Sequence, residues 1–473
     1  MHFIIYIVAF LEGFTTLSVE IVALRKFTPI IGSSSISTSI ILWVILLALS
    51  YWYYKWGQIS AIGKNIEKIL LRNLLISSAY YFFLTFVFAE FAIQNLLFAT
   101  GNYFFAILIS SILLFFIPVF LASQTIPLLS ELLKGNHSGE KMWKLLFYST
   151  VWSFAGSVGT STVFFPWIWV NKTAAIAPIF LVVCAIFMMF FMKKFSHILS
   201  FISAGLLGFY VLFLFTNILN PNIIFSTSNA YHNIVIYDNQ ENTQRIFSMD
   251  WAYSSGVNID DKTSFFQYIK EAEKKVEEIQ PKNILVIWAA GFTFPRDISR
   301  FEFVENIDVI DVDKDLKEIA EKYFLEEKLS EKIHFYAQPA RYFLNNLDEN
   351  KKYDFILVDA YSWKSIPPQV LTQEFFQKLQ DHWENIFLNI ITDIYRETQL
   401  SQNLFTTLET VFENVYFKNT NKSLGAKMTN FIVTNKKYED YFLNGINDAQ
   451  IYTDNLNTIE KDLFSQNNFQ YEK

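Results

Sequence analysis

Acidic side chains at the ends of predicted strands are the residues of this sequence best suited to chemistry. Asp311 and Asp313 lie at the end of the predicted strand 307–312, and Asp359 follows the apolar run 355–358. A carboxylate in this position can accept hydrogen bonds from ribose hydroxyls. We therefore expect a site that binds a nucleoside.

A short turn after an earlier predicted strand, 283–287, completes the set. It reads Trp288-Ala289-Ala290-Gly291, and Asp311 follows at the spacing of about 20 residues that separates turn and acidic residue in dinucleotide-binding units. Each signal alone is weak, since Asp commonly ends strands and caps helices. The ordered set is stronger, so we predict that this turn, Asp311 and Asp313 bind a nucleoside cofactor.

The elements that would position these residues alternate between strand and helix. Predicted strands cover 283–287, 307–312, 333–336, 355–358, 386–390, 415–418 and 430–434, with a helix at 314–324. Such alternation predicts an α/β fold with a parallel, doubly wound sheet, in which ligands bind at the carboxyl ends of the strands. Short strands at 233–237 and 244–249 and an amphipathic helix at 264–279 form a small β segment before it.

The run 283–376 resembles spermidine synthase, the polyamine aminopropyltransferase family. The resemblance lies in the glycine-rich turn, in Asp311-Val312-Asp313, in the strand 353–359 and in the later segment 371–376, while 249–254 is similar to the segment that enters the family's active site. It implies a Rossmann-like, class I methyltransferase-type fold. It also implies decarboxylated S-adenosylmethionine or S-adenosylmethionine as a substrate, with no metal.

The resemblance also implies roles for single residues. Gly291 and its neighbours would face the nucleoside, Asp311 would hold the ribose, and Asp359 would accept the proton of an attacking amine such as a polyamine. The implied substrate-binding residues are Asp250, Tyr253, Ser254, Tyr361 and Ser362.

Several positions depart from the family's pattern. The family's turn usually contains an Asp, which is missing here, its catalytic loop has a second Asp where this chain has Ser362, and Ser254 stands where a Gln is usual. Loss of carboxylates weakens the hold on a polycation. Two alternatives therefore stay open: an S-adenosylmethionine-dependent methyltransferase-like enzyme, and a polyamine or cation transporter or sensor with a degenerate synthase domain.

The N-terminal part of the chain is far more apolar than the rest. About seven runs approach the roughly 20 apolar residues that a bilayer span requires, in a chain with 52% hydrophobic and 18% charged residues. We predict a transmembrane helical domain at 1–220, the small β segment with its helix at 221–280 and the Rossmann-like domain at 281–473. The first part resembles the membrane region fused to such domains in bacteria, which implies a protein integral to the bacterial cell membrane.

Orientation and polar residues in the apolar runs raise further questions. The positive-inside bias of seven spans would place the soluble domain outside, whereas a cytosolic nucleoside requires it inside, and a re-entrant segment at 149–161 would reconcile the two. Glu12 and Glu20 lie at predicted membrane depth, where carboxylates are functional candidates and could hold a cation. Hydrogen bonds between helices are the alternative explanation for them.

Charge and cysteine content exclude several kinds of protein. The net charge of -7, with no basic stripe, argues against nucleic-acid binding. Cys184 is the single cysteine, so neither a disulfide framework nor a cysteine-based metal site can form. The expected partners are the lipid bilayer and a small amine, with a homodimer left open.

Tryptophans occupy positions that favour glycine. Trp288 stands where the first glycine of a nucleotide-binding turn is needed, and Trp363 lies in the loop after Asp359, where the resemblance implies another. The chain has 15 Gly and 11 Trp, against about 33 Gly at average usage. We therefore hypothesise that some of these tryptophans are UGA codons that the source organism reads as glycine.

Overall fold

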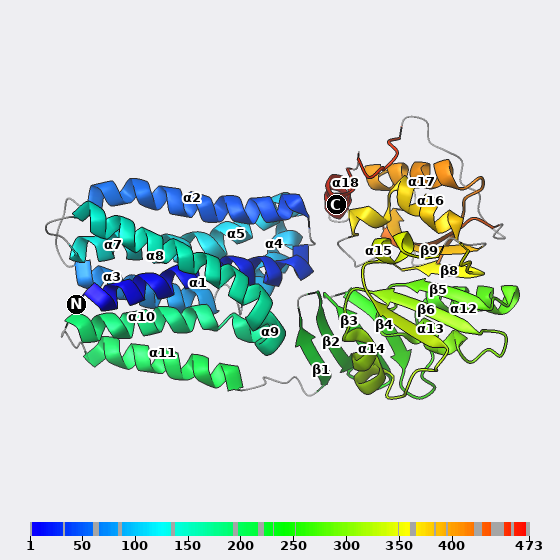
Figure 1. Cartoon of the computed structure of the whole chain (residues 1–473), viewed down its shortest axis with the longest axis horizontal. Helices are drawn as coiled ribbons and strands as arrows, with labels where there is room; N and C mark the ends of the chain where they lie inside the picture. Colours follow the sequence, from blue (N-terminus) through cyan, green and yellow to red (C-terminus); the bar gives the residue numbers. More distant parts are fainter. Residues whose placement is uncertain are drawn as a thin grey trace. The chain divides into compact units, whose positions relative to one another are not determined.

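The computed structural model describes most of the chain: residues 2–31, 34–59, 66–83, 88–133, 138–192, 197–215, 222–229, 231–250, 252–348, 350–359, 366–382, 385–393, 396–420, 428–436, 449–455 and 458–469. The chain divides into two compact units (Figure 1). The first comprises Met1–Ile218 with Ser228–Ala230, and the second comprises Leu219–Thr227 with Tyr231–Lys473.

Residues 2–215 are helical almost throughout their described part. In chain order the helices are α1 (His2–Ile31), α2 (Ser35–Ile59), α3 (Ile66–Tyr80), α4 (Ala89–Thr100), α5 (Tyr103–Ser111), α6 (Ile117–Ala122), α7 (Thr125–Leu132), α8 (Ser138–Gly159), α9 (Phe165–Thr173), α10 (Ile176–Met192) and α11 (His197–Phe215). π-helical turns at Ile112–Phe116 and Thr160–Phe164 join α5 to α6 and α8 to α9 without a break.

Helices α1 and α8 pack with their backbones in close approach. A Cβ atom at Gly13 would lie 2.2 Å from the backbone oxygen of Ser149, and one at Gly156 would lie 2.2 Å from that of Phe14. The hydroxyl of Ser153 donates to the carbonyl oxygen of Gly13 at 2.9 Å. Small residues permit this approach, which is how apolar helices gain dispersion contacts where no hydrophobic effect drives them together.

Two helical stretches among the described residues are long and apolar enough to cross a bilayer, Ile4–Thr28 and Tyr103–Leu132. Four further helices are apolar but shorter, with 10–17 residues each. A bundle of about seven spans therefore remains a prediction.

The segment 149–161 does not form the re-entrant break that we expected. Helix α8 continues to Gly159 and runs on into the π-helical turn. The Ser153 hydroxyl also donates to the carbonyl oxygen of Ser149, one turn back, so its polar group is satisfied inside a continuous helix.

The second unit begins with a four-stranded sheet of order β1-β2-β3-β4. The strands are β1 (Ile223–Ser228), β2 (Asn233–Asp238), β3 (Gln244–Met249) and β4 (Ala252–Asn258), and β3 pairs antiparallel with both β2 and β4. The sequence predicted β2 and β3 but not β1 or β4. In β4 the pair Ser254-Ser255 interrupts the alternation of apolar and polar residues on which strand prediction depends.

A seven-stranded sheet of order β10-β11-β9-β8-β5-β6-β7 forms the centre of the second unit. Its strands are β5 (Asn283–Ile287), β6 (Asn306–Asp311), β7 (Ile333–Ala337), β8 (Phe355–Val358), β9 (Ile386–Asp393), β10 (Tyr416–Asn419) and β11 (Met428–Thr434). Strands β5 to β9 are parallel in the Rossmann-like order, whereas β11 pairs antiparallel with β9 and β10. The sheet is therefore mixed, where we had predicted a parallel one.

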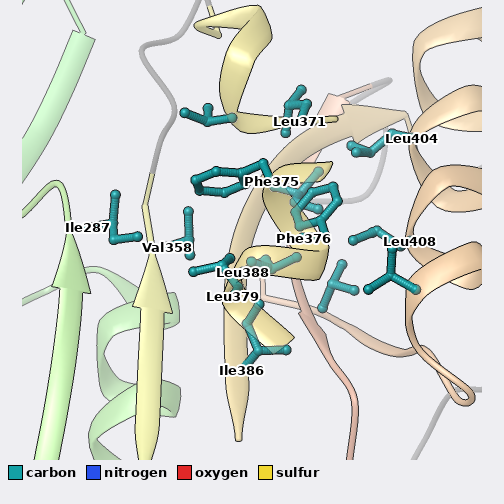
Figure 2. Packing of buried hydrophobic residues seen from close by; sticks show 14 of the residues in the cluster. Ile287, Val358, Leu371, Phe375, Phe376, Leu379, Ile386, Leu388, Leu404 and Leu408 are labelled. Atoms are coloured by element: carbon teal, nitrogen blue, oxygen red, sulfur yellow. The ribbon is translucent and has the colours of Figure 1, made fainter. Parts of the chain in front are cut away.

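Helices cover both faces of this sheet, and β5 shows why. Leu285 and Ile287 belong to one buried cluster, while Ile284 and Val286 belong to the other, because successive side chains of a strand point to opposite faces. Figure 2 shows part of the first cluster, between the strands and two helices. The first cluster also takes residues from α15 (Ala340–Asn345), α16 (Gln373–Asp381), α17 (Gln399–Val411) and α18 (Ile459–Phe469), and the second from α12 (Gln267–Ile279), α13 (Thr293–Ile298) and α14 (Leu316–Ile319).

Two predicted helices differ from the observed ones. The helix predicted at 264–279 begins at Gln267, because Ser264 forms a β-bridge with Val257 instead. The helix predicted at 314–324 consists of the short α14 followed by a π-helical turn at Ala320–Phe324.

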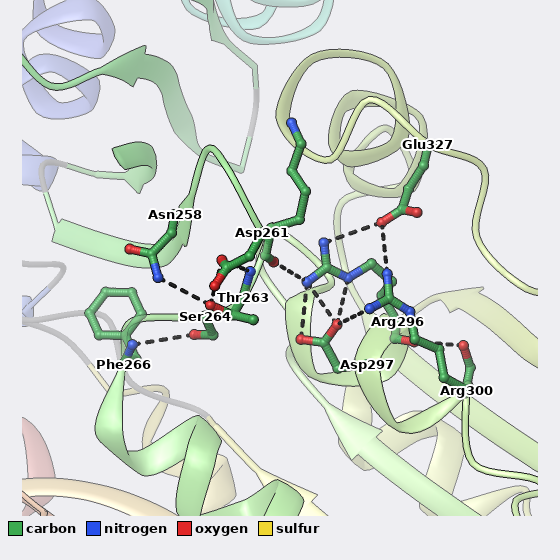
Figure 3. A network of polar contacts seen from close by, with 11 residues as sticks. Asn258, Asp261, Thr263, Ser264, Phe266, Arg296, Asp297, Arg300 and Glu327 are labelled. Carbon is green, nitrogen blue, oxygen red and sulfur yellow. Dashed lines mark hydrogen bonds and ion pairs between the residues drawn. The ribbon is translucent and has the colours of Figure 1, made fainter. Parts of the chain in front are cut away.

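A buried arginine ties the small sheet to the larger one (Figure 3). The Arg296 guanidinium, in α13, is almost fully buried. It forms ion pairs with Asp297 at 2.7 Å and with Glu327 at 3.2 Å, and it donates to the carbonyl oxygen of Lys262 in the loop after β4. These ion pairs and this hydrogen bond replace the water that the guanidinium loses, so it can be buried where the two sheets meet.

Candidate functional site

Three strand ends meet at the carboxyl edge of the central sheet. Ile287 of β5 pairs with Ile310 of β6 on one side and with Val358 of β8 on the other. Trp288, Asp311 and Asp359 are the next residues of these three strands, so they leave the sheet side by side. This is the edge at which open α/β sheets bind ligands.

Asp359 is held at both carboxylate oxygens. The Tyr268 hydroxyl, in α12, donates to Oδ2 at 2.8 Å, and the Asn389 side-chain amide, in β9, donates to Oδ1 at 2.8 Å. Burial raises the pKa of Asp359 to about 6, and the hydrogen bonds from Asn389 and Tyr268 oppose that rise. The carboxyl group is thus fixed in place and titrates close to neutral pH.

Asp311 is also buried, but its two oxygens differ. Oδ1 accepts a hydrogen bond from the backbone N–H of Asp313 at 3.0 Å, whereas Oδ2 has no hydrogen-bond partner among the described residues. Burial raises the pKa of Asp311 to about 6, and the nearby His232 opposes the rise. An oxygen that is buried and unbonded is suited to a ligand hydroxyl.

Asp250 and His232, which adjoin strands of the small sheet, belong to the same site. His232 Nδ1 lies 3.0 Å from Asp250 Oδ2, and Asp250 Oδ1 accepts the backbone N–H of Asn233 at 2.9 Å. Burial would lower the pKa of His232, but the hydrogen bond and charge of Asp250, with the charges of Asp311 and Asp313, raise it above its usual value. The three carboxylates thus favour the protonated form of the imidazole.

The turn after β5 has an unusual backbone. Trp288, Ala290 and Phe292 have φ angles of 64°, 44° and 60°, in the left-handed region. The Trp288 N–H donates to the carbonyl oxygen of Ile310, and the Gly291 N–H donates to Ser255 Oγ at 3.0 Å. The predicted cofactor-binding turn is therefore bonded to both β6 and β4.

The predicted substrate-binding residues fall into two groups. Tyr253 and Ser254 lie in β4, where the Tyr253 side chain is 62% exposed and the Ser254 hydroxyl donates to the carbonyl oxygen of Ala252. The next residue, Ser255, is the one that contacts the turn. Tyr361, Ser362 and the tryptophans Trp251, Trp363 and Trp383 lie outside the described residues.

Tyr268, Asn389 and His232 were missed by sequence reasoning. Asn389 carried a signal, because a polar residue inside the apolar run 386–390 needs a buried partner. Tyr268 carried a weaker one, as an aromatic with a polar tip on the apolar side of a predicted helix. Its hydrogen bond to Asp359 joins residues 91 positions apart, which no local pattern reveals.

Metal-binding groups are scarce in the described part of the chain. No group of three or more His, Cys, Asp or Glu side chains is arranged there to hold a metal ion. Cys184 is buried in α10, as a free thiol.

Comparison with known proteins identifies the central sheet. Residues 270–444 match the family model "Spermine/spermidine synthase domain". The chain contains a spermine/spermidine synthase domain. Among curated relatives, a polyamine aminopropyltransferase of Vibrio vulnificus is 22% identical over 41% of this chain and 66% of its own length, and one of Alkaliphilus oremlandii is 31% identical over 20% and 34%. This chain thus spans less than two thirds of each of these relatives.

A probable spermidine synthase from Corynebacterium glutamicum superposes with a TM-score of 0.41 at 14% identity, over 50% of this chain and 98% of its own. The synthase domain contains the turn at 288–292, Asp311, Asp359 and Asn389, whereas His232, Asp250 and Tyr268 precede its first matched residue.

Proposed function

We propose that this protein is a membrane-bound transferase that moves an aminopropyl group from decarboxylated S-adenosylmethionine to an amine such as a polyamine. The observation that carries the proposal is Asp359, a buried carboxyl group that Tyr268 and Asn389 fix at the strand end beside the nucleotide-type turn. The names of the matched relatives, polyamine aminopropyltransferases, support the same reaction.

Proton transfer to Asp359 follows from the chemistry of that reaction. The amine nitrogen attacks the carbon bonded to the sulfonium, a C–N bond forms, and the C–S bond breaks to leave a neutral thioether. Attack requires an unprotonated amine, so a base must take one proton from the nitrogen. With a pKa of about 6, Asp359 is largely ionised at pH 7 and can bind the cationic amine before it accepts that proton.

Nucleoside binding falls to Asp311 in this proposal. Its Oδ2, for which the described residues offer no partner, would accept a hydrogen bond from a ribose hydroxyl, and the turn from Trp288 to Gly291 would lie against the nucleoside. Asp313 Oδ1 accepts a hydrogen bond from the backbone N–H of Asp315, which stabilises the conformation of the segment after β6. No metal takes part in this scheme.

The chain lacks some of the carboxylates that are usual in the family, so a methyltransferase-like enzyme is the second candidate. Ser362 replaces a catalytic-loop Asp, so fewer negative charges remain to hold a polycation. A methyltransferase-like enzyme would share the nucleoside site but not the amine site, because fold alone does not set chemistry. Isothermal titration with both nucleosides separates the two: preference for S-adenosylmethionine over its decarboxylated form would favour the methyltransferase.

Membrane attachment through the helical unit is the second part of the proposal. Many large apolar side chains of these helices are exposed, including Phe98 at 81%, Phe201 at 82% and Trp167 at 80%. Exposure on this scale is unfavourable in water and favourable against lipid. We place the synthase domain in the cytoplasm, where its nucleoside substrate is made, and a reporter fused after Lys473 tests that orientation.

A transporter or sensor role is the alternative that the helical unit supports. The Glu12 side chain is 4% exposed, and its oxygens accept hydrogen bonds from the hydroxyls of Thr16 at 3.1 Å and Ser149 at 3.2 Å. Both donors are neutral, so neither compensates a negative charge on Glu12, and the carboxyl group could bind a proton or a cation. Glu20, the other candidate, is partly exposed.

Paired variants decide between transfer and transport. Under our proposal Asp359→Asn abolishes product formation and retains nucleoside binding, while the exposed Asp381→Asn leaves both unchanged. Polyamine flux in proteoliposomes that survives Asp359→Asn but fails in Glu12→Gln or Glu20→Gln would instead favour transport.

A further inference from the structure

The turn at 288–292 demands backbone angles that side chains resist. Trp288 has a φ of 64°, and Ala290 and Phe292, at 44° and 60°, share the left-handed region with it. An L-residue there brings its Cβ atom too close to the following carbonyl oxygen, whereas glycine has no Cβ atom and pays no such penalty. Of the three residues, Trp288 has the largest side chain.

The position of Trp288 makes a large side chain costly for function as well. Trp288 follows β5, between the strand ends that carry Asp311 and Asp359. A nucleoside bound at such a switch point needs the backbone of this turn within close reach, which an indole obstructs. The indole is partly buried and packs against the core cluster of the neighbouring helices.

A second tryptophan, in the helical unit, lies within a contact that small residues otherwise form. Residues 149, 153 and 156 of α8 form the close approach to α1, and Trp152 lies on that side of α8, where its ring centroid is 3.8 Å from that of Phe10. Aromatic pairs prefer centroid separations of about 4.5–7 Å. A glycine at 152 would make the row of small residues continuous between positions 149 and 156 of α8.

We infer that positions 288 and 152 are glycines in the protein that the source cell makes, encoded by UGA codons that this cell reads as glycine. Backbone conformation carries the inference at 288, and helix packing carries it independently at 152. The composition agrees, since the sequence has 15 Gly and 11 Trp, where about 33 Gly would be average. Glycine at 288 opens the turn to the nucleoside.

Mass spectrometry of the native protein tests the residue identities directly. The tryptic peptide 283–296 includes position 288 and no other tryptophan position. The peptide 145–172 includes position 152 together with Trp167 and Trp169. We expect fragment masses with glycine at 288 and at 152, and UGA at both codons. A tryptophan mass at 288, or a UGG codon at either position, overturns the inference.

Recombinant variants test the backbone argument without reference to any catalytic activity. Trp288→Gly should unfold at a higher temperature than Trp288→Ala, since both remove the indole but only glycine relieves the positive φ. Equal unfolding temperatures would contradict the conformational reasoning. Nucleoside titration of Trp288→Gly is a separate measurement: if the masses show glycine and this variant binds no nucleoside, the proposed function fails while the inference stands.

Discussion

Replacement of Tyr268 by phenylalanine should make Asp359 a weaker acid. The substitution keeps the ring in α12 and deletes only the hydroxyl that donates to Asp359 Oδ2 at 2.8 Å. That hydrogen bond favours the ionised carboxylate, so its loss must raise the pKa of Asp359 above the present value of about 6. Asn389 remains in place and still donates to the other oxygen.

The size of the shift follows from the strength of one hydrogen bond to a charged group. Such bonds contribute about 1.5–3 kcal/mol, and one pKa unit corresponds to about 1.36 kcal/mol. The pKa of Asp359 should therefore rise by about one to two units, to between about 7 and 8. At pH 7 the ionised fraction falls from about nine tenths to between a half and a tenth.

Two measurements report this shift. The pH profile of kcat/KM should move its acidic limb upward, with activity recovering above pH 8 or so. Potentiometric titration of the full chain in detergent, taken as the difference from the matching Asp359→Asn variant, gives the same pKa without any turnover. Tyr342→Phe, at an exposed tyrosine of α15, is the matched control and should shift neither.

A particular result would refute the reasoning about Tyr268. If Tyr268→Phe lowers activity equally at every pH and the difference titration is unchanged, the hydroxyl does not stabilise the carboxylate. The hydrogen bond would then only position the side chain.

Three further substitutions have expected outcomes. Asp359→Asn should raise the free energy of unfolding of the second unit at pH 7 by up to about 3 kcal/mol. The folded protein raises the pKa of Asp359 from 3.8 to about 6, so ionisation of this group destabilises the fold as the pH rises through 6. Thermal unfolding of the variant and the parent should therefore agree below about pH 4. Arg296→Met should cost about 3–5 kcal/mol in urea unfolding, while Arg300→Met, at a side chain 57% exposed, should cost under about 1 kcal/mol. Gly13→Ala should lower the melting temperature of the helical unit, since its Cβ atom would lie 2.2 Å from a backbone oxygen, whereas Gly205→Ala, with nothing within 4 Å, should not.

The parallel core of the sheet could be predicted because its strands are buried on both faces. The runs 284–287 and 355–358 are apolar throughout, and they lie in β5 and β8. Burial at both faces leaves little room for polar residues inside these two runs, and the carboxyl ends of parallel strands share one edge, which is why Asp311 and Asp359 could be assigned to that edge. The sequence did not reveal that β11 runs antiparallel, since direction depends on the connection and not on the composition of a strand.

Contacts between distant segments are what the sequence could not supply. Asp359 depends on Tyr268 and Asn389, 91 residues before it and 30 residues after it. The register of β4 was equally hidden: its pairing with β3 shifts between Phe247 and Ser248, and Ser255, which the sequence did not single out, is the residue that reaches the turn. A one-residue change in register exchanges the two faces of a strand, and local patterns do not determine it.

The two buried carboxyl groups of the site show how similar chemistry can serve different tasks. Burial raises the pKa of both Asp311 and Asp359 to about 6. Asp359 has a donor from the chain at each oxygen, so its position is set before a ligand arrives and its remaining lone pairs can take a proton. Asp311 Oδ2 has no partner in the described part of the chain, and a ligand hydroxyl can supply its hydrogen bond. The two carboxyl groups therefore differ in their hydrogen-bond partners and not in their acidity. This difference suits Asp359 to act as the base and Asp311 to bind the ligand.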